Sequence, residues 1–216
     1  FKYALMTNSG SSANLLAVST IINPLRKKSL KKGDEVLIPA VCWSTSLWPI
    51  VQNGLKPVFV DVEMDTFNIS LKDLQKKITK KTKAIMCIHI LGTSANMKKL
   101  QIIAKKNNII LIEDTCESLG AKYEKKYLGS FGEFSTFSFY YSHQITCGEG
   151  GMIVCQNKED YEILKTLRSH GWSRNTSFEK IFKKKYDKVD KRFMFVNSGY
   201  NLRPTDIQAA IAQNQL

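Results

Sequence analysis

Two short apolar runs constrain the fold of this chain more than any other feature. They cover Ala84–Ile90 and Ile109–Ile112, and neither alternates apolar with polar residues as a half-exposed strand does. Such continuous runs are typical of strands that are buried on both faces of a parallel sheet. Candidate helices separate these runs from further candidate strands, and this alternation predicts an α/β fold with a mostly parallel, covered sheet.

The expected elements follow one another through short connections. Helices are expected over residues 11–22, 45–52, 70–78, 97–106 and 159–168, and strands over residues 35–38, 56–60, 84–90, 109–112, 134–139 and 152–154. The 216 residues suffice for one sizeable core, and no internal repeat or Pro/Ser-rich linker divides them. Because the chain opens without Met and stops within an Ala/Gln-rich helical pattern at Gln213–Leu216, we expect it to be a piece of a longer protein.

The net charge of +13 leaves nucleic acid or an anionic membrane open as partners. The lysines are scattered in pairs, however, and do not form one stripe with interleaved aromatic residues, so a solvated surface is the favoured interpretation. The one dense cluster runs from Lys183 to Arg192, in a predicted loop that is either solvated or faces an anionic substrate. No apolar run approaches the roughly 20 residues that span a bilayer.

The five cysteines show no C-x-x-C pairing, and most lie in apolar or strand-like settings. This pattern is typical of buried free thiols in a reducing compartment, so we expect a cytoplasmic protein without a metal site.

Small polar residues surround the start of the first predicted helix, in the segment Asn8–Asn14. The amide groups of a helix N-terminus and two hydroxyl groups can hold a phosphate, although the same residues also serve as plain helix caps. Asp114 closes a buried parallel strand, where carboxylates face the ligand side of such sheets. Asp114 is either a helix cap or the anion that keeps the pyridine nitrogen of a bound cofactor protonated. Glu117 is either a capping partner of Asp114 or a second contact of that cofactor.

Trp43 lies just past another predicted strand, where an aromatic ring can stack on a flat ligand or simply belong to the core. His89 ends a core strand and His170 lies in a turn, so both are interpreted as structural.

These clues occur within an ordered series of motifs. The series contains Asn8-Ser9-Gly10-Ser11-Ser12-Ala13, Gly33-Asp34-Glu35-Val36, Pro57-Val58-Phe59-Val60-Asp61-Val62, Glu113-Asp114, Gly129-Ser130-Phe131-Gly132, Ser138-Phe139-Tyr140, Gly148-Glu149-Gly150-Gly151 and Gly199-Tyr200-Asn201-Leu202-Arg203. It resembles the DegT/DnrJ/EryC1/StrS family of nucleotide-sugar enzymes, which depend on pyridoxal phosphate (PLP) and have the aspartate aminotransferase fold (fold type I). The resemblance covers essentially the whole chain and implies one PLP-binding large domain over residues 1–216, without an N-terminal segment and most of a small C-terminal domain.

The resemblance also implies roles for individual residues. Gly10, Ser11 and Ser12 would hold the cofactor phosphate together with Ser138, and Trp43 would stack on the pyridine ring. Asp114 would pair with the ring nitrogen, with Glu117 nearby. Asn201 would reach the phosphate in a neighbouring subunit, so the implied assembly is a homodimer.

His143 stands where the family carries the lysine that binds the cofactor covalently. An imidazole cannot form that bond but can move protons, so the change argues for chemistry other than simple transamination. The resemblance implies a sugar 3-dehydratase with His143 as acid and base and with non-covalent PLP or pyridoxamine phosphate (PMP). One such branch adds an iron–sulfur cluster through a cysteine, but residues 168–203 contain none. The other branch implies a GDP-linked 4-keto-6-deoxymannose substrate and glutamate as amino donor, in deoxysugar and lipopolysaccharide O-antigen biosynthesis.

Two other classes of function stay open. An ordinary sugar aminotransferase of the same family would need a lysine at position 143, and neither Ser142 nor Gln144 supplies one. A non-catalytic, basic α/β binding domain would fit the charge but would not need Trp43, Asp114 and the phosphate cradle in register. The favoured interpretation is therefore an enzyme that binds neither nucleic acid nor a membrane.

Overall fold

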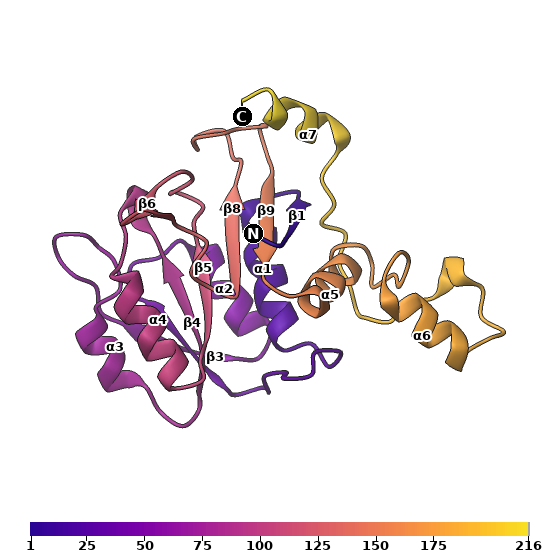
Figure 1. The fold of residues 1–216 in the computed structure, drawn as a ribbon, viewed down its shortest axis with the longest axis horizontal. Helices are drawn as coiled ribbons and strands as arrows, with labels where there is room; N and C mark the ends of the chain where they lie inside the picture. The colour runs from indigo at the N-terminus through magenta and orange to yellow at the C-terminus, as the bar shows by residue number, and fades with distance from the viewer. Residues whose placement is uncertain (216) are drawn as a thin grey trace.

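The computed structural model describes residues 1–215 as a sheet of seven strands in the order β1-β9-β8-β5-β4-β2-β3, covered by helices (Figure 1). The sheet strands are β1 (Tyr3–Thr7), β2 (Glu35–Pro39), β3 (Lys56–Val60), β4 (Thr82–Ile88), β5 (Ile110–Asp114), β8 (Phe134–Ser138) and β9 (Gly151–Cys155). The helices are α1 (Gly10–Ile21), α2 (Ser44–Gln52), α3 (Leu71–Lys77), α4 (Met97–Lys106), α5 (Lys158–Arg168), α6 (Ser177–Lys185) and α7 (Asp206–Gln213). Short 3-10 turns, η1 (Ile90–Gly92) and η2 (Lys191–Phe193), and a small hairpin of β6 (Lys122–Tyr123) and β7 (Lys126–Tyr127) complete the chain.

The prediction of a mostly parallel sheet is confirmed. Neighbouring strands from β3 to β8 run parallel, whereas β9 is antiparallel to both β8 and β1. The helix-containing crossovers of the parallel part cover both faces of the sheet, as βαβ connections do.

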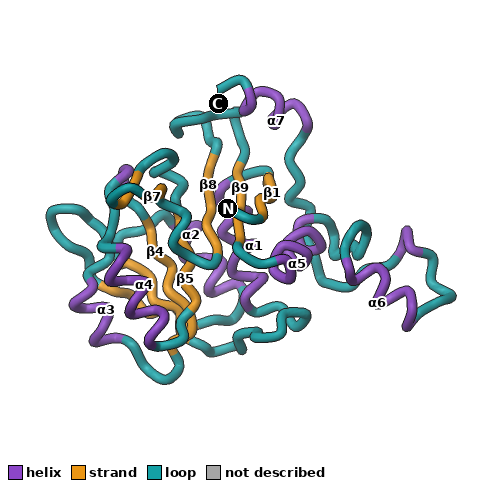
Figure 2. The backbone as a smooth tube through the Cα atoms, in the orientation of Figure 1, coloured by secondary structure: helices purple, strands orange, loops and turns teal. Residues whose placement is uncertain are grey.

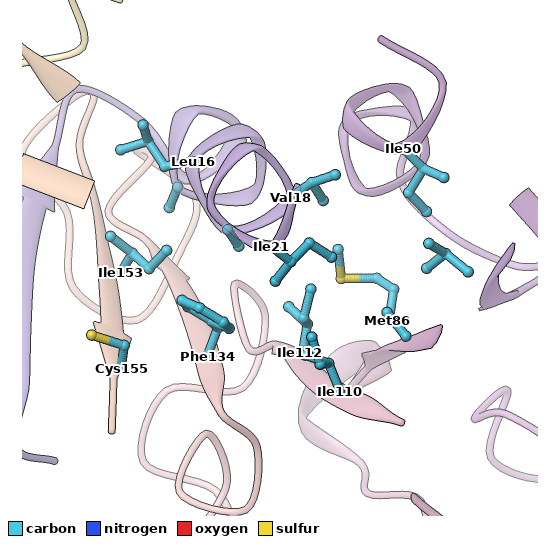
Figure 3. Packing of buried hydrophobic residues seen from close by; sticks show 14 of the residues in the cluster. Leu16, Val18, Ile21, Ile50, Met86, Ile110, Ile112, Phe134, Ile153 and Cys155 are labelled. Atoms are coloured by element: carbon cyan, nitrogen blue, oxygen red, sulfur yellow. The ribbon is translucent and has the colours of Figure 1, made fainter. Parts of the chain in front are cut away.

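The two apolar runs owe their composition to this double cover. Along β4, Ala84, Met86 and Ile88 belong to the core cluster under α1 and α2, whereas Ile85 and Cys87 belong to the cluster under α3 and α4. Figure 3 shows Met86, Ile112 and Phe134 packed beneath Val18 and Ile21 of α1. Successive side chains of a strand point to opposite faces, so a strand covered on both sides must be apolar throughout.

Helix α1 is the most deeply buried helix of the sheet region. All but two of its 12 residues are buried, and Ser9 caps its N-terminus by accepting a hydrogen bond from the amide of Ser12. A helix enclosed in this way holds its first turn in a fixed place, close to the carboxyl ends of β5 and β8.

The C-terminal part of the chain is built differently. Figures 1 and 2 show α6 lying well apart from the sheet, and α6, η2 and α7 contain no buried residue among those described. The predicted loop from Lys183 to Arg192 is wrong in its first part, because Lys183–Lys185 form the last turn of α6, where positive charge complements the helix dipole. The expected helical pattern at the end of the chain is α7, and Leu216 lies outside the described residues.

No helix in residues 1–215 combines the length and the apolar character that crossing a membrane requires.

Candidate functional site

A cavity of about 460 Å³ opens where the first turn of α1 meets the carboxyl ends of β4, β5 and β8. In open α/β sheets ligands bind at this edge, because loops and helix N-termini converge there. Main-chain amides, hydroxyl groups, carboxylates and two imidazoles line the cavity together with Trp43 and Tyr140.

Asp114, the last residue of β5, provides the buried negative charge of the cavity floor. Asn14 Nδ2 and Ser46 Oγ donate hydrogen bonds to its Oδ2 over 2.8 and 2.7 Å, and the Cys116 amide donates to its Oδ1 over 3.1 Å. Thr136 in turn donates to Asn14 Oδ1 over 2.7 Å, so a chain of side chains fixes the carboxylate. Asp114 is only 5% exposed and lines the cavity, so a rigidly held carboxylate faces any ligand that binds there.

The start of α1 lies close against β8 beside this floor. The first amides of a helix have no partner within the helix, and they carry its partial positive charge. Gly10 leaves no room for a side chain, because a Cβ atom there would lie 2.6 Å from Ser138 Cβ and 3.0 Å from Cys116 Sγ. The backbone at Gly10 therefore approaches Ser138 of β8 closely.

Cys116 lies beside both Asp114 and the start of α1. Burial raises the pKa of its thiol well above the ordinary value for cysteine, and the neighbouring Asp114 carboxylate raises that pKa further. The thiol therefore stays protonated and adds no second negative charge to the floor.

The rim of the cavity carries Trp43, Glu117 and His143. Trp43 is 71% exposed at the N-cap of α2, so one face of its indole is free. Glu117 Oε2 accepts a hydrogen bond from the Leu91 amide over 2.8 Å, which ties η1 to the rim. His143 lies in the turn after β8, where its amide donates to Tyr140 O over 3.0 Å and its half-buried ring meets the Tyr140 ring edge to face at 6.1 Å.

Most of the predicted site residues meet in this cavity: Gly10, Ser11, Trp43, Asp114, Glu117, Ser138 and His143. Ser12 does not line it, because its hydroxyl points back to the cap and accepts a hydrogen bond from Ser9 Oγ over 2.9 Å. Asn201 also lies elsewhere, exposed, where its Oδ1 accepts a hydrogen bond from Arg203 Nε over 3.2 Å.

Sequence reasoning missed several lining residues, among them Asn14, Ser46, His89 and Glu149. Asn14 carried a usable signal, because it lies four residues after Gly10 and therefore on the same face of a helix. Ser46 and His89 carried none, since their roles depend on contacts with β5 that no local pattern announces.

The fold and the cavity define a protein of the aspartate aminotransferase type, the fold of PLP-dependent transferases. Within that class the chain belongs to the DegT/DnrJ/EryC1/StrS aminotransferase family, whose model matches residues 1–216.

Similar curated proteins include two 3-dehydratases. The chain is 43% identical to the GDP-4-keto-6-deoxy-D-mannose 3-dehydratase of Escherichia coli O55:H7, and 42% identical to the enzyme of the same name from Yersinia pseudotuberculosis. All of this chain is matched in both comparisons, but it covers only 56% and 55% of the two relatives, so it spans about half their length.

Similar solved structures include the same kind of enzyme. A variant of GDP-4-keto-6-deoxymannose-3-dehydratase with bound GDP-perosamine superposes with a TM-score of 0.91 at 42% identity, over 99% of this chain and 56% of that one. The same kind of enzyme with a trapped PLP–glutamate geminal diamine gives a TM-score of 0.90 at 41% identity, with the same shares of the two chains covered.

Proposed function

We propose that this protein catalyses the PLP/PMP-dependent removal of the C3 hydroxyl group from a 4-keto-6-deoxy nucleotide sugar, with GDP-4-keto-6-deoxy-D-mannose as the substrate best supported. One observation carries the proposal: His143 lies at the rim of the cavity, and no residue that lines it within the described part of the chain is a lysine. A family member without that lysine cannot hold the cofactor covalently, and an imidazole in its place can still transfer protons.

The residues of the cavity fit the proposed cofactor. Gly10, Ser11 and Ser138 offer amide and hydroxyl donors to a phosphate at the start of α1, where a Cβ on Gly10 would fill the space. Asp114 offers a fixed carboxylate to a protonated ring nitrogen, and the exposed indole of Trp43 offers a flat surface to the ring.

The cofactor, when bound, supplies an electron-withdrawing ring and, in its amine form, a nitrogen for the C4 carbonyl of the sugar. Asp114 would keep the ring nitrogen protonated, which would sustain that withdrawal. His143 would take a proton from the carbon that bears the amine and give one to the departing C3 oxygen. Glu117 anchors η1 beside this place, so the rim keeps its shape around the sugar.

Glutamate is proposed as the source of nitrogen and electrons. In the overall reaction C3 loses its hydroxyl oxygen and is reduced, glutamate is oxidised to 2-oxoglutarate, and the glutamate nitrogen leaves as ammonia. No iron–sulfur cluster is required, because the two electrons come from glutamate. The relative with a trapped PLP–glutamate geminal diamine supports this donor.

A homodimer in the cytoplasm completes the proposal. Asn201 is exposed and does not line the cavity of its own chain, which suits a residue that serves the phosphate site of a neighbouring subunit. The five free cysteines suit a reducing compartment, and a GDP-sugar product suits O-antigen biosynthesis.

The test is incubation of the full-length protein with PLP, glutamate and GDP-4-keto-6-deoxymannose, followed by mass spectrometry of the sugar. We expect a product that has lost the C3 oxygen, together with 2-oxoglutarate and ammonia. An amino sugar as product would overturn the proposal and identify an aminotransferase, and a CDP-linked sugar run in parallel tests the choice of nucleotide.

A further inference from the structure

The turn that carries His143 is bonded to α7, a helix from the other end of the chain. The turn connects β8 to β9 over residues 139–150, and only Phe139, Cys147 and Gly150 of it are buried. Figure 1 shows α7 close to this turn, beyond the carboxyl end of β8. With so little of the turn packed into the core, hydrogen bonds have a large share in fixing its shape.

Gln215, which follows α7, pairs with the main chain of the turn. Its Oε1 accepts a hydrogen bond from the Thr146 amide over 2.9 Å, and its Nε2 donates one to the carbonyl oxygen of the same residue. The side-chain amide therefore takes the place of a neighbouring strand, which also bonds to both main-chain groups of one residue. Thr146 is fixed in this way three residues beyond His143.

Gln208, in the first turn of α7, holds a second point of the turn. Its Nε2 donates a hydrogen bond to the carbonyl oxygen of Glu149 over 2.7 Å. Its Oε1 accepts a hydrogen bond from the Thr205 amide over 2.8 Å, as part of the capping box that begins the helix. Both ends of the side-chain amide are occupied, so the start of α7 is tied to Glu149, a residue that lines the cavity.

The same turn is also tied to the rim of the cavity. Gln144, the residue after His143, donates a hydrogen bond from its Nε2 to the carbonyl oxygen of Glu117 over 2.8 Å. His143, Glu117 and Glu149 all line the cavity. The segment after His143 is therefore bonded to the rim at one point and to α7 and its following residue at two others.

We propose that Gln208 and Gln215 are positioning residues for His143: through the turn they hold the imidazole at the place where it transfers protons. This inference rests on the proposed function, since His143 is taken as the acid and base. It gives α7 a role that its burial does not announce, because no residue of the helix is buried. Ala212 of α7 packs against the small apolar cluster of β8, β9 and the turn, so the helix joins the turn through this contact and the glutamine side chains.

Glutamate variants test this role with the least change of shape. Gln208→Glu and Gln215→Glu each keep the oxygen that accepts an amide hydrogen bond, but each loses the nitrogen that donates to the turn. The new negative charge also repels the carbonyl oxygen that it faces. Gln213→Glu is the matched control, because it makes the same change on α7 at an exposed side chain that forms no hydrogen bond with residues 1–215.

The first readouts need no substrate and use the full-length apo protein. Mass spectrometry follows the hydrogen–deuterium exchange of residues 139–150 and the rate at which diethyl pyrocarbonate modifies His143. We expect exchange in the turn to be about tenfold faster in Gln208→Glu and in Gln215→Glu, the effect of one lost hydrogen bond, and His143 to be modified faster in both. Gln213→Glu should match the wild type in both rates.

The second readouts separate positioning from a merely structural role. We expect kcat for dehydration to fall about tenfold in each of the two variants, while KM for the sugar and the PLP dissociation constant stay near those of the wild type. A merely structural α7 would lower the thermal midpoint and leave kcat and the reactivity of His143 equal to those of Gln213→Glu. That result would overturn the inference.

The two variants change different residues, so either one alone decides the question. Wild-type protein that performs no dehydration would overturn the proposed function. Turn exchange and His143 modification at control rates would overturn the inference whether or not the protein is active, so the two failures are distinguishable.

Discussion

The floor of the cavity and its rim differ in burial and in hydrogen bonding. The floor residues are at most 5% exposed: Asn14, Ser46 and Asp114. Hydrogen bonds from Asn14 and Ser46 hold the Asp114 carboxylate, and a hydrogen bond from Thr136 holds Asn14. On the rim, Trp43 is 71% exposed, and the imidazole of His143 makes no hydrogen bond with residues 1–215, although its amide and its ring both contact Tyr140.

This difference in burial indicates that the floor and the rim of the cavity have different functions. A floor whose side chains are locked by packing and hydrogen bonds can hold a rigid cofactor without reorganising. Exposed side chains such as that of Trp43 on the rim are less constrained than those of the floor. Changes on the floor should therefore alter cofactor binding and electronics, whereas changes on the rim should alter the proton transfers.

His143→Asn should have the largest effect and the most selective one. Loss of a positioned acid and base typically lowers a rate by about 10²–10⁴-fold, and we expect turnover to fall within that range while PLP affinity stays near that of the wild type. The checks are steady-state product formation and PLP titration, with Lys72→Ala on the exposed side of α3 as a matched surface control. A His143→Asn enzyme with nearly full turnover would remove the rim from the chemistry.

Asp114→Asn should follow, with a fall in turnover of about 10²–10³-fold and an intact fold. The amide oxygen can still accept from Asn14 and Ser46, but the ring nitrogen of the cofactor loses its anionic partner. Circular dichroism should match the wild type, while the absorbance of bound PLP should change. Turnover near the wild-type value would show that Asp114 serves only as a cap.

Gly10→Ala should weaken cofactor binding at the start of α1. The new Cβ would lie 2.6 Å from Ser138 Cβ, so α1 and β8 must move apart, and overpacking of this kind costs about 1–3 kcal/mol. We expect a lower thermal midpoint together with weaker PLP binding. Ser11→Ala, which removes only a hydroxyl bonded to Thr45, should lower the affinity less.

Cys116 should give the smallest effect, seen in its reactivity with iodoacetamide as a function of pH. Its raised pKa keeps the thiol protonated at neutral pH, so labelling of the apo form should begin only at a pH above that needed for an exposed cysteine. Asp114→Asn removes one cause of the shift, so labelling should begin at a lower pH in that variant. Because burial is the larger cause, the displacement should be modest, and rapid labelling at pH 7 would contradict the account of the floor.

The sequence predicted those features of the fold and the site that have a local origin. Strands β4 and β5 are apolar on both faces, which identifies a covered parallel sheet. Gly10 marks the start of a helix, and Asp114 marks the end of a strand. Strand β1 was missed, because its five residues are stabilised by pairing with β9 about 150 positions away.

Tertiary contacts explain the rest. Ser46 reaches Asp114 across 68 positions of sequence, and Asn14 does so across 100. His89 was interpreted as a core histidine, which is correct for its burial, but its free Nδ1 becomes visible only once Glu113 is seen to occupy Nε2.

The central claim is that the cofactor sits on the floor without a covalent link, because His143 replaces the lysine of the rim. Its most direct test is borohydride treatment of the full-length protein loaded with PLP, followed by intact-protein mass spectrometry, with His143→Lys as the positive control. The account predicts that the wild-type mass stays unchanged after the treatment, whereas the mass of the lysine variant increases by one reduced cofactor. A wild-type protein that gains the mass of the reduced cofactor at stoichiometric yield would contradict it.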